Sequence, residues 1–294
     1  MNLALRFTWW RERRRQHPAD EIQRVGDLSE QRLAKLCRAA GKKNGWQVFE
    51  SVRIPDEELG GKREIDLVIV GGHTLLVIEQ KHWSGRFEIN EQEEFIQHRK
   101  NGTTHNHSTV NQRISRKAAM LTMMHEQRVP NAEEIDVRVI LAFTNENLKW
   151  PDTVNMLSSD VVNETGLLSI LEREDPGKMN QDLLNTISGF GTWDEVVLNG
   201  GFICKGDVLD LGLGSEIYSW QSSRSAELDA ACQHQTGLLS LLSRKPSRVE
   251  LTFTHHHLKA SLPYGASLRM HIVGKDVAEQ ILWSTISHIR LSKP

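Results

Sequence analysis

Residues 63–85 of this chain read REIDLVIVGGHTLLVIEQKHWSG. Two apolar runs, 65–70 and 74–81, flank the pair Gly71-Gly72. Short apolar runs on either side of a Gly-Gly pair are typical of two strands joined by a tight turn. The stretch therefore predicts a β-hairpin, and the rest of the chain can be organised around it.

Charged residues end the second of these strands. Side chains two apart in a strand share a face, so Glu79 and Lys81 are expected to point the same way, beside Leu75 and Val77. If the hairpin pairs in the simple register, Asp66 lies across from this charged end. The pattern is an Asp on one strand and Glu-x-Lys on the next.

Such a cluster has a definite chemical use. Two close carboxylates repel each other unless a divalent cation neutralises them, and Mg2+ or Mn2+ prefers oxygen ligands of this kind. A lysine beside them can orient an attacking water and offset charge on a phosphate. From these residues alone, a second interpretation stays open: Asp66 in a turn contact, with Glu79 and Lys81 in an ordinary ion pair.

The surrounding motifs resemble those of the nuclease-related domain (NERD) family, a branch of the PD-(D/E)xK restriction-endonuclease-like nucleases. The resemblance covers about residues 26–150. The matching features, in chain order, are Gly26 and Glu30, Glu64-Ile65-Asp66, Val77 to Lys81, Trp83-Ser84-Gly85, and Gln112. The family often has Asn-Pro ahead of the glutamine, where this chain has Ser108 and Thr109.

The resemblance implies a fold and an activity. We expect an α/β, restriction-endonuclease-like mixed sheet flanked by helices, and a Mg2+- or Mn2+-dependent nuclease that hydrolyses phosphodiester bonds, in DNA. Asp66 and Glu79 would bind the metal and Lys81 would orient or activate water. Glu30 and Gln112 would complete the catalytic group.

A helix expected over residues 109–127 carries Gln112 together with a basic cluster. Arg113, Arg116 and Lys117 lie on its early turns, and we expect them to bind substrate. Because the formal net charge of the whole chain is only -2, a nucleic-acid site must be a local patch such as this one.

Glu30 has two interpretations. A helix expected from Asp27 would make Asp27 and Glu30 a capping box. Glu30 also shares a helical stripe with Leu33 and Cys37, which turns it toward the buried side and the metal site. We favour the second interpretation, through the family resemblance.

The segment from Glu88 to Ser108 is polar and is expected to be a loop near the substrate, after a short strand at 86–89. Its histidines lack ligands at zinc-site spacing, so we interpret them as exposed. Further elements are expected as strands at 46–54, 136–143 and 154–157 and a helix at 166–174.

The 294 residues suit two domains. We expect a basic and aromatic segment at 1–25, the nuclease-like domain at 26–176, a linker at 177–192 and a smaller α+β or barrel-like domain at 193–294. Expected elements of the last are a helix near 225–242 and strands near 195–203, 206–211, 249–254, 268–273 and 281–289.

The three cysteines are far apart and odd in number, and no uncharged run reaches the roughly 18 residues of a membrane span. We therefore expect a cytoplasmic protein without stable membrane insertion. Arg11 and Arg13 to Arg15 could bind DNA, lie on a membrane surface, or face solvent while nearby aromatic residues pack on the body.

Several alternatives stay open. The fold could serve a non-catalytic nucleic-acid-binding or scaffold protein, or an RNA nuclease. Action with a partner such as a helicase, and the oligomeric state, are also open.

Overall fold

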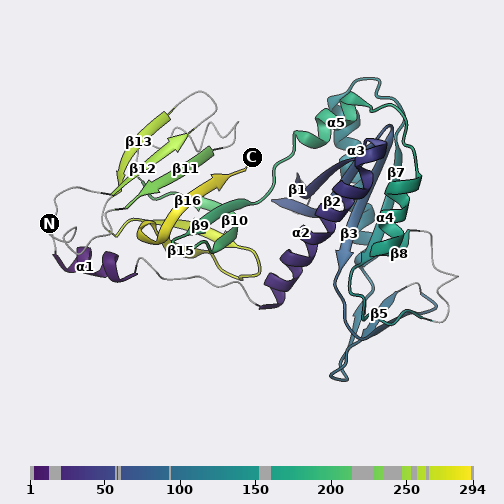
Figure 1. Ribbon diagram of the computed structural model, residues 1–294, viewed down its shortest axis with the longest axis horizontal. Coiled ribbons are helices and arrows are strands. Elements are labelled where there is room, and N and C mark those ends of the chain that lie inside the picture. The colour runs from purple at the N-terminus through teal and green to yellow at the C-terminus, as the bar shows by residue number, and fades with distance from the viewer. Residues whose placement is uncertain are drawn as a thin grey trace. The chain divides into compact units, whose positions relative to one another are not determined.

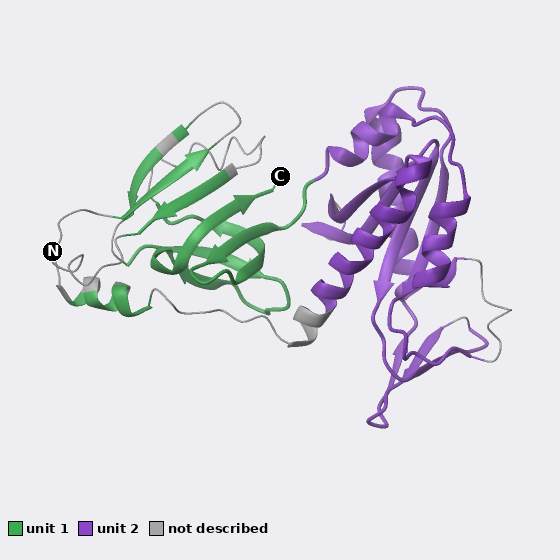
Figure 2. Ribbon diagram, viewed as in Figure 1, with its two compact units in different colours: residues 1–23, 191–294 green, residues 24–190 purple. Residues whose placement is uncertain are grey.

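The structure is a computed structural model that describes residues 3–12, 21–56, 58, 61–92, 94–151, 160–213, 228–234, 247–252, 257–262 and 265–292. The chain forms two compact units, shown in Figure 2. Unit 2 is Arg24–Phe190, and unit 1 combines Met1–Gln23 with Gly191–Pro294.

A five-stranded mixed sheet lies at the centre of unit 2, in the order β1-β2-β3-β7-β8 (Figure 1). Its strands are β1 (Gln47–Pro55), β2 (Lys62–Gly71), β3 (Thr74–Lys81), β7 (Asp136–Phe143) and β8 (Val161–Asn163). The first three pair antiparallel, and β7 and β8 add in parallel. The expected α/β class with a mixed sheet flanked by helices is confirmed.

Helices cover both faces of this sheet, and each face buries its own apolar cluster. On one face lie α2 (Glu21–Gly41) and α4 (Glu164–Arg173), through Leu33, Cys37 and Leu167 among others. On the other lie α3 (Val110–Arg128) and α5 (Gln181–Ser188). The alternation of side chains along β2 and β3 supplies apolar residues to both layers.

The hairpin turn at the start of this core requires glycine. Gly72 has φ +54°, and a Cβ there would lie 1.7 Å from the backbone oxygen of Pro176. Any side chain would collide with this backbone, so the close approach depends on Gly72.

Two expectations within unit 2 are wrong. Because α2 runs from Glu21 to Gly41, Asp27 and Glu30 lie inside the helix and do not form a capping box at its start. The polar segment 88–108 is not a loop. It forms a second sheet of β4 (Arg86–Ile89), β5 (Phe95–His98) and β6 (Thr104–His107).

This three-stranded sheet has an aromatic core of its own. Trp83, Phe87 and Phe95 are buried against Phe143 at the end of β7, and the Phe87 and Phe143 rings stack at 4.7 Å between centroids. The sheet therefore packs on the end of the central sheet at which β3 finishes.

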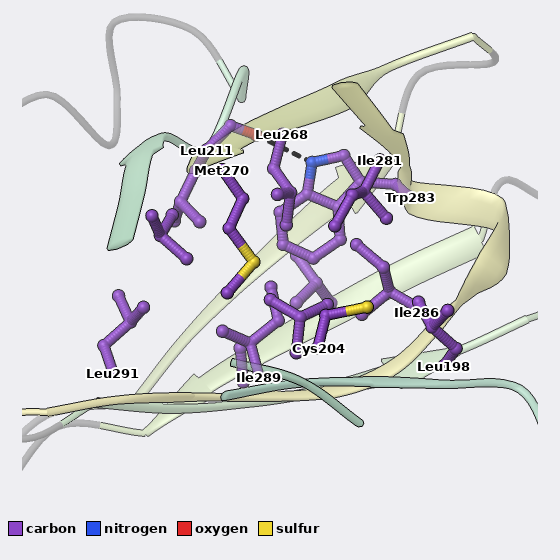
Figure 3. Packing of buried hydrophobic residues seen from close by; sticks show 14 of the residues in the cluster. Leu198, Cys204, Leu211, Leu268, Met270, Ile281, Trp283, Ile286, Ile289 and Leu291 are labelled. Carbon is purple, nitrogen blue, oxygen red and sulfur yellow. Dashed lines mark hydrogen bonds between the residues drawn. The ribbon is translucent and has the colours of Figure 1, made fainter. Parts of the chain in front are cut away.

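Unit 1 is a curled antiparallel half-barrel of eight strands, in the order β13-β12-β11-β16-β9-β10-β14-β15. Their bounds are β9 (Asp194–Leu198), β10 (Ile203–Asp210), β11 (Leu228–Gln233), β12 (Ser247–Thr252), β13 (His257–Leu262), β14 (Ser267–Ile272), β15 (Glu279–Leu282) and β16 (Ile286–Leu291). Figure 3 shows its core, in which the buried Trp283 donates its indole N–H to the Leu211 carbonyl at 2.7 Å.

The helix expected near 225–242 is wrong where the structure can test it, because Leu228–Gln233 is the strand β11. The stretch is rich in alanine and leucine, which favour helix in isolation. In the fold it pairs with β12 on one side and β16 on the other, and Ala230 is fully buried. Tertiary pairing overrides the local propensity.

The N-terminal helix α1 (Leu3–Glu12) contacts the short 3-10 helix η5 (Trp283–Thr285) within unit 1. Phe7 stacks on Trp10. Three parts of the chain lie outside the described residues: the expected strand at 154–157, Arg13 to Arg15, and the pair His255 and His256. Among the helices that the structure describes, none combines the length and apolar character needed to cross a bilayer.

The packing of α5 yields a prediction about the extent of unit 2. Leu183 and Ile187 are buried in the α3 layer, and Thr186 hydrogen-bonds His125 of α3 at 3.0 Å. A fragment of residues 24–190 should fold. A fragment ending at residue 176 should lose about 3 to 6 kcal/mol of unfolding free energy, because two large apolar side chains are removed. Urea unfolding followed by circular dichroism measures both.

Leu183→Ala tests the same contact in the full chain and should cost about 2 to 5 kcal/mol. The control is Leu28→Ala, at a leucine of α2 that is 59% exposed. Equal stability of the two fragments would show that α5 is dispensable for this core.

Candidate active site

The end of the β2–β3 hairpin brings two carboxylates onto one face. Leu67 pairs with Ile78, so the next residues along the strands, Asp66 and Glu79, lie across from each other. The backbone N–H of Gln80 donates to Asp66 Oδ2 at 2.7 Å. Asp66 is thereby fixed against β3.

Two lysines hold Glu79. Lys81 Nζ lies 2.7 Å from Glu79 Oε1, and Lys117 Nζ of α3 lies 2.8 Å from Glu79 Oε2. The three side chains are 17 to 23% exposed, so their charges are only partly screened by water. Each oxygen of Glu79 therefore carries its own ammonium partner.

This arrangement treats the two carboxyl groups differently. Burial raises the pKa of Asp66 to about 7, and the nearby negative charge of Glu79 adds to the rise. Burial also acts to raise the pKa of Glu79, but Lys81 and Lys117 outweigh it and hold that pKa below its ordinary value. Glu79 is the stable anion of the pair, and Asp66 is the group that resists ionisation.

A second cluster of charges joins Arg116 of α3 to the connection between β1 and β2. Asp56, whose side chain is 2% exposed, accepts hydrogen bonds from Arg63 at 2.8 Å and from Arg116 at 2.9 Å. Arg116 also contacts Glu58 at 2.8 Å. The structure thus places Arg116 with Asp56 and Arg63, whereas Lys117 contacts Glu79.

The remaining expected site residues lie on α2 and α3. Glu30 is half-buried on α2, and neither Asp66 nor Glu79 owes its pKa shift to it. Gln112 and Arg113 are exposed near the start of α3. Across the described residues no hydrogen bond or ion pair joins the Gln112 side chain to the carboxylates.

Opposite the carboxylates, a polar cluster joins β3 to α2. Gln80 Nε2 donates to Ser29 Oγ at 2.6 Å, and Ser29 Oγ lies 3.0 Å from Thr144 Oγ1 and 3.1 Å from His82 Nδ1. Gln80, Ser29 and Thr144 are buried. These bonds fix the end of β3 on the face of the sheet that α2 covers. They therefore set the direction in which Glu79 and Lys81 project from the opposite face.

Sequence reasoning missed a histidine near the site. His107, on β6, stacks on Trp83 with 4.1 Å between ring centroids. Burial lowers the pKa of His107, and the charge of Lys81 lowers it further, so the ring is neutral at pH 7. The sequence signal that could have placed His107 is the dipeptide Asn101-Gly102. Asn-Gly between two short runs is a strong indicator of a hairpin, and here it connects β5 to β6, which carries His107.

Residues 25–144 match the nuclease-related domain (NERD) family. No curated protein and no solved structure matches the chain.

The matched range contains Asp66, Glu79, Lys81 and Lys117, so the whole carboxylate and lysine cluster lies inside the segment that is similar to the NERD family. It also contains Gly85, whose φ of +91° and close approach to the His98 carbonyl exclude any side chain. The similarity to a nuclease-related family is therefore located in the part of the chain that carries the charged cluster.

The raised pKa of Asp66 predicts a pH dependence of stability. Between pH 3.8 and about 7 the folded state retains a proton on Asp66 that the unfolded chain has released. The contribution of Asp66 to the unfolding free energy therefore falls as pH rises, by up to about 1.4 kcal/mol per pH unit. Asp66→Asn cannot titrate, so its stability relative to wild type should increase through this window and level off above it.

Urea unfolding in a metal chelator over this pH range measures the difference. Asp136→Asn, which removes an exposed carboxylate from β7 of the same sheet, is the control. A constant difference between Asp66→Asn and wild type would contradict the assignment of the raised pKa to Asp66.

Proposed function

We propose that this protein is a metal-dependent nuclease that hydrolyses phosphodiester bonds in DNA. One observation carries the proposal: within the segment that is similar to the NERD family, Asp66 and Glu79 share a face while Lys81 and Lys117 each contact Glu79. Carboxylates and ammonium groups in one place match the two needs of phosphodiester hydrolysis, which are a cation site and stabilisation of phosphate charge.

The residues fit a hard divalent cation by their donor chemistry. Mg2+ keeps several waters and is commonly held by one or two carboxylates together with substrate phosphate oxygens. Asp66 and Glu79 supply two carboxylates, and no cluster of three acidic, histidine or cysteine ligands occurs among the residues described. Burial is the main cause of the raised pKa of Asp66, and repulsion by Glu79 adds to it; a cation would relieve this repulsion.

When bound, the cation supplies Lewis-acid polarisation of a phosphate oxygen. The chain's own residues supply the rest. Lys81, fixed by Glu79 at the end of β3, orients the attacking water and offsets the charge that develops on the phosphate. Lys117 reaches Glu79 from α3 and binds the phosphate backbone of the substrate.

Cysteines without disulfides support a reducing, cytoplasmic location as part of this proposal. Cys37, Cys204 and Cys232 form no disulfide bond. Burial raises the pKa of Cys37 to about 12, so this thiol stays protonated and inert inside the α2 layer.

The proposal predicts a stabilising response to metal ions. Binding to the folded state alone raises the unfolding free energy by about 2.7 kcal/mol when free ion is a hundredfold above its Kd. Mn2+ should therefore stabilise the wild type, and Asp66→Asn and Glu79→Gln should remove both this shift and cleavage. Calorimetry with Mn2+ and gel assays on linear, circular and single-stranded DNA and on RNA measure the two effects.

A protein that binds no Mn2+, with or without DNA, and cleaves no nucleic acid would contradict the proposal and favour a scaffold. Cleavage confined to RNA would retain the chemistry and change the substrate. Cleavage that depends on an added helicase would assign the protein to a partnered reaction.

The two lysines should differ in role. Lys81→Ala should lower kcat by about 100-fold or more while leaving Mn2+ affinity largely intact, because Lys81 acts on the transition state. Lys117→Ala should mainly raise KM, since Lys117 contacts the substrate backbone. Steady-state kinetics of the two variants separate these effects.

Lys35→Ala, which removes an exposed lysine from α2, controls for the loss of one positive charge. Equal losses of kcat for Lys81→Ala and Lys117→Ala would reject the division of roles.

A further inference from the structure

Two cavities adjoin on the α3 side of unit 2, and both are lined by Asp56, Arg116 and Met120. The smaller has a volume of about 250 Å³ and the larger a volume of about 360 Å³. All the side chains that line the smaller cavity except Met120 are charged, whereas most of those that line the larger one are apolar. Together they form a hollow with a charged end and a mainly apolar end.

The smaller cavity is built for an anion. Its lining contains four cations, Arg63, Arg113, Arg116 and Lys117, and one carboxylate, Asp56. Asp56 is almost fully buried and bonds to both Arg63 and Arg116, so it positions these guanidinium groups. These four positive charges exceed the single negative one by three. Guanidinium forks held in this way match the geometry of a phosphate.

Arg113 strengthens this assignment. Its side chain is exposed and, within the described part of the chain, has no acceptor. Arg63 donates its Nε to Asp56, and no other acceptor for it is found among those residues. The cavity therefore retains N–H donors for a ligand.

The larger cavity is apolar. Met120, Met123 and Met124 line it together with Ala119, and Met123 is 48% exposed. Methionine side chains are flexible and polarisable, and their sulfur atoms make favourable contacts with aromatic rings. Asp56, Glu58, Arg116 and Gln127 add polar groups to its lining. A flat ring with a polar edge suits these walls.

The hollow leads to the carboxylates. Lys117, in the wall of the smaller cavity, also contacts Glu79 at 2.8 Å. From Lys117 to Gln127 the helix α3 extends for roughly 15 Å, with the cations toward its start and the methionines beyond them. A chain of phosphates and bases can therefore follow α3 away from Glu79.

We propose that the two cavities form a subsite for one unpaired nucleotide, with its phosphate in the smaller cavity and its base in the larger. A base inside a duplex is stacked and paired, and its removal costs free energy. An unpaired base can instead lie against side chains. The preferred substrate is therefore single-stranded nucleic acid or an unpaired end. This inference deepens the proposed function, on which it rests for the direction of the strand toward Glu79.

Equilibrium binding tests the subsite without any cleavage. Fluorescence anisotropy in a metal chelator compares a short single strand with a blunt duplex of the same sequence, and wild type should bind the single strand more tightly. Met123→Ala should weaken single-strand binding by about tenfold, because a base contact is lost. Arg113→Gln should weaken it too, and should reduce the slope of log K against log salt by about 0.7, the value for one phosphate contact on a single strand.

Matched variants on α2 give the controls. Leu28→Ala removes an exposed apolar side chain and Lys35→Gln removes an exposed positive charge, and both should bind as wild type does. Duplex binding at least as tight as single-strand binding, or a loss for Met123→Ala no larger than for Leu28→Ala, would overturn the subsite. A wild type that shows the expected binding but cleaves nothing with Mn2+ would remove the nuclease proposal and support the subsite.

Discussion

The site depends on one constraint: two carboxylates must stay close together where the pairing of two interior strands of an apolar sheet ends. The protein neutralises one of them. Glu79 is held between the ammonium groups of Lys81 and Lys117, whereas Asp66 has a backbone N–H as its hydrogen-bond donor. Partly buried ion pairs of this kind contribute little net stability, because desolvation offsets the Coulomb attraction. They persist where they fix charges in a position that chemistry requires.

The strand β3 meets this constraint with both of its faces. Glu79 and Lys81 project toward α3, and Gln80 projects toward α2, where it bonds to Ser29. Its backbone N–H reaches across to Asp66. Within the described residues the side-chain oxygen of Gln80 is buried without a partner, which costs stability. Glu79, Gln80 and Lys81 thus position the charges of the site. The buried oxygen of Gln80 lowers the stability of the same end of the sheet.

The sequence predicted the central hairpin well, because alternation, the Gly71-Gly72 turn and the family pattern agree there. In the small sheet after β3, the strand β4 was predicted at residues 86–89, but β5 and β6 were not, since they are four residues long and contain many polar side chains. The strand β11 was mistaken for a helix, because its burial comes from neighbours far away in sequence. The charged residues of α3 were all expected near the substrate. Their different partners are visible only in the structure, where Lys117 contacts Glu79 and Arg116 contacts Asp56.

The parallel pairing of β3 with β7 has a consequence for how this domain can diversify. The chain must cross from Lys81, at the end of β3, to Asp136, at the start of β7. The small sheet of β4, β5 and β6 is inserted in this crossover ahead of α3. Pairing fixes both ends of the connection, and α3 within it packs on the sheet and places Lys117 on Glu79. The small sheet packs on Phe143 through Trp83, Phe87 and Phe95, so its core residues also reach the end of β7. The turn between β5 and β6 is exposed at residues 99–103, so its length and sequence can change without reaching either contact.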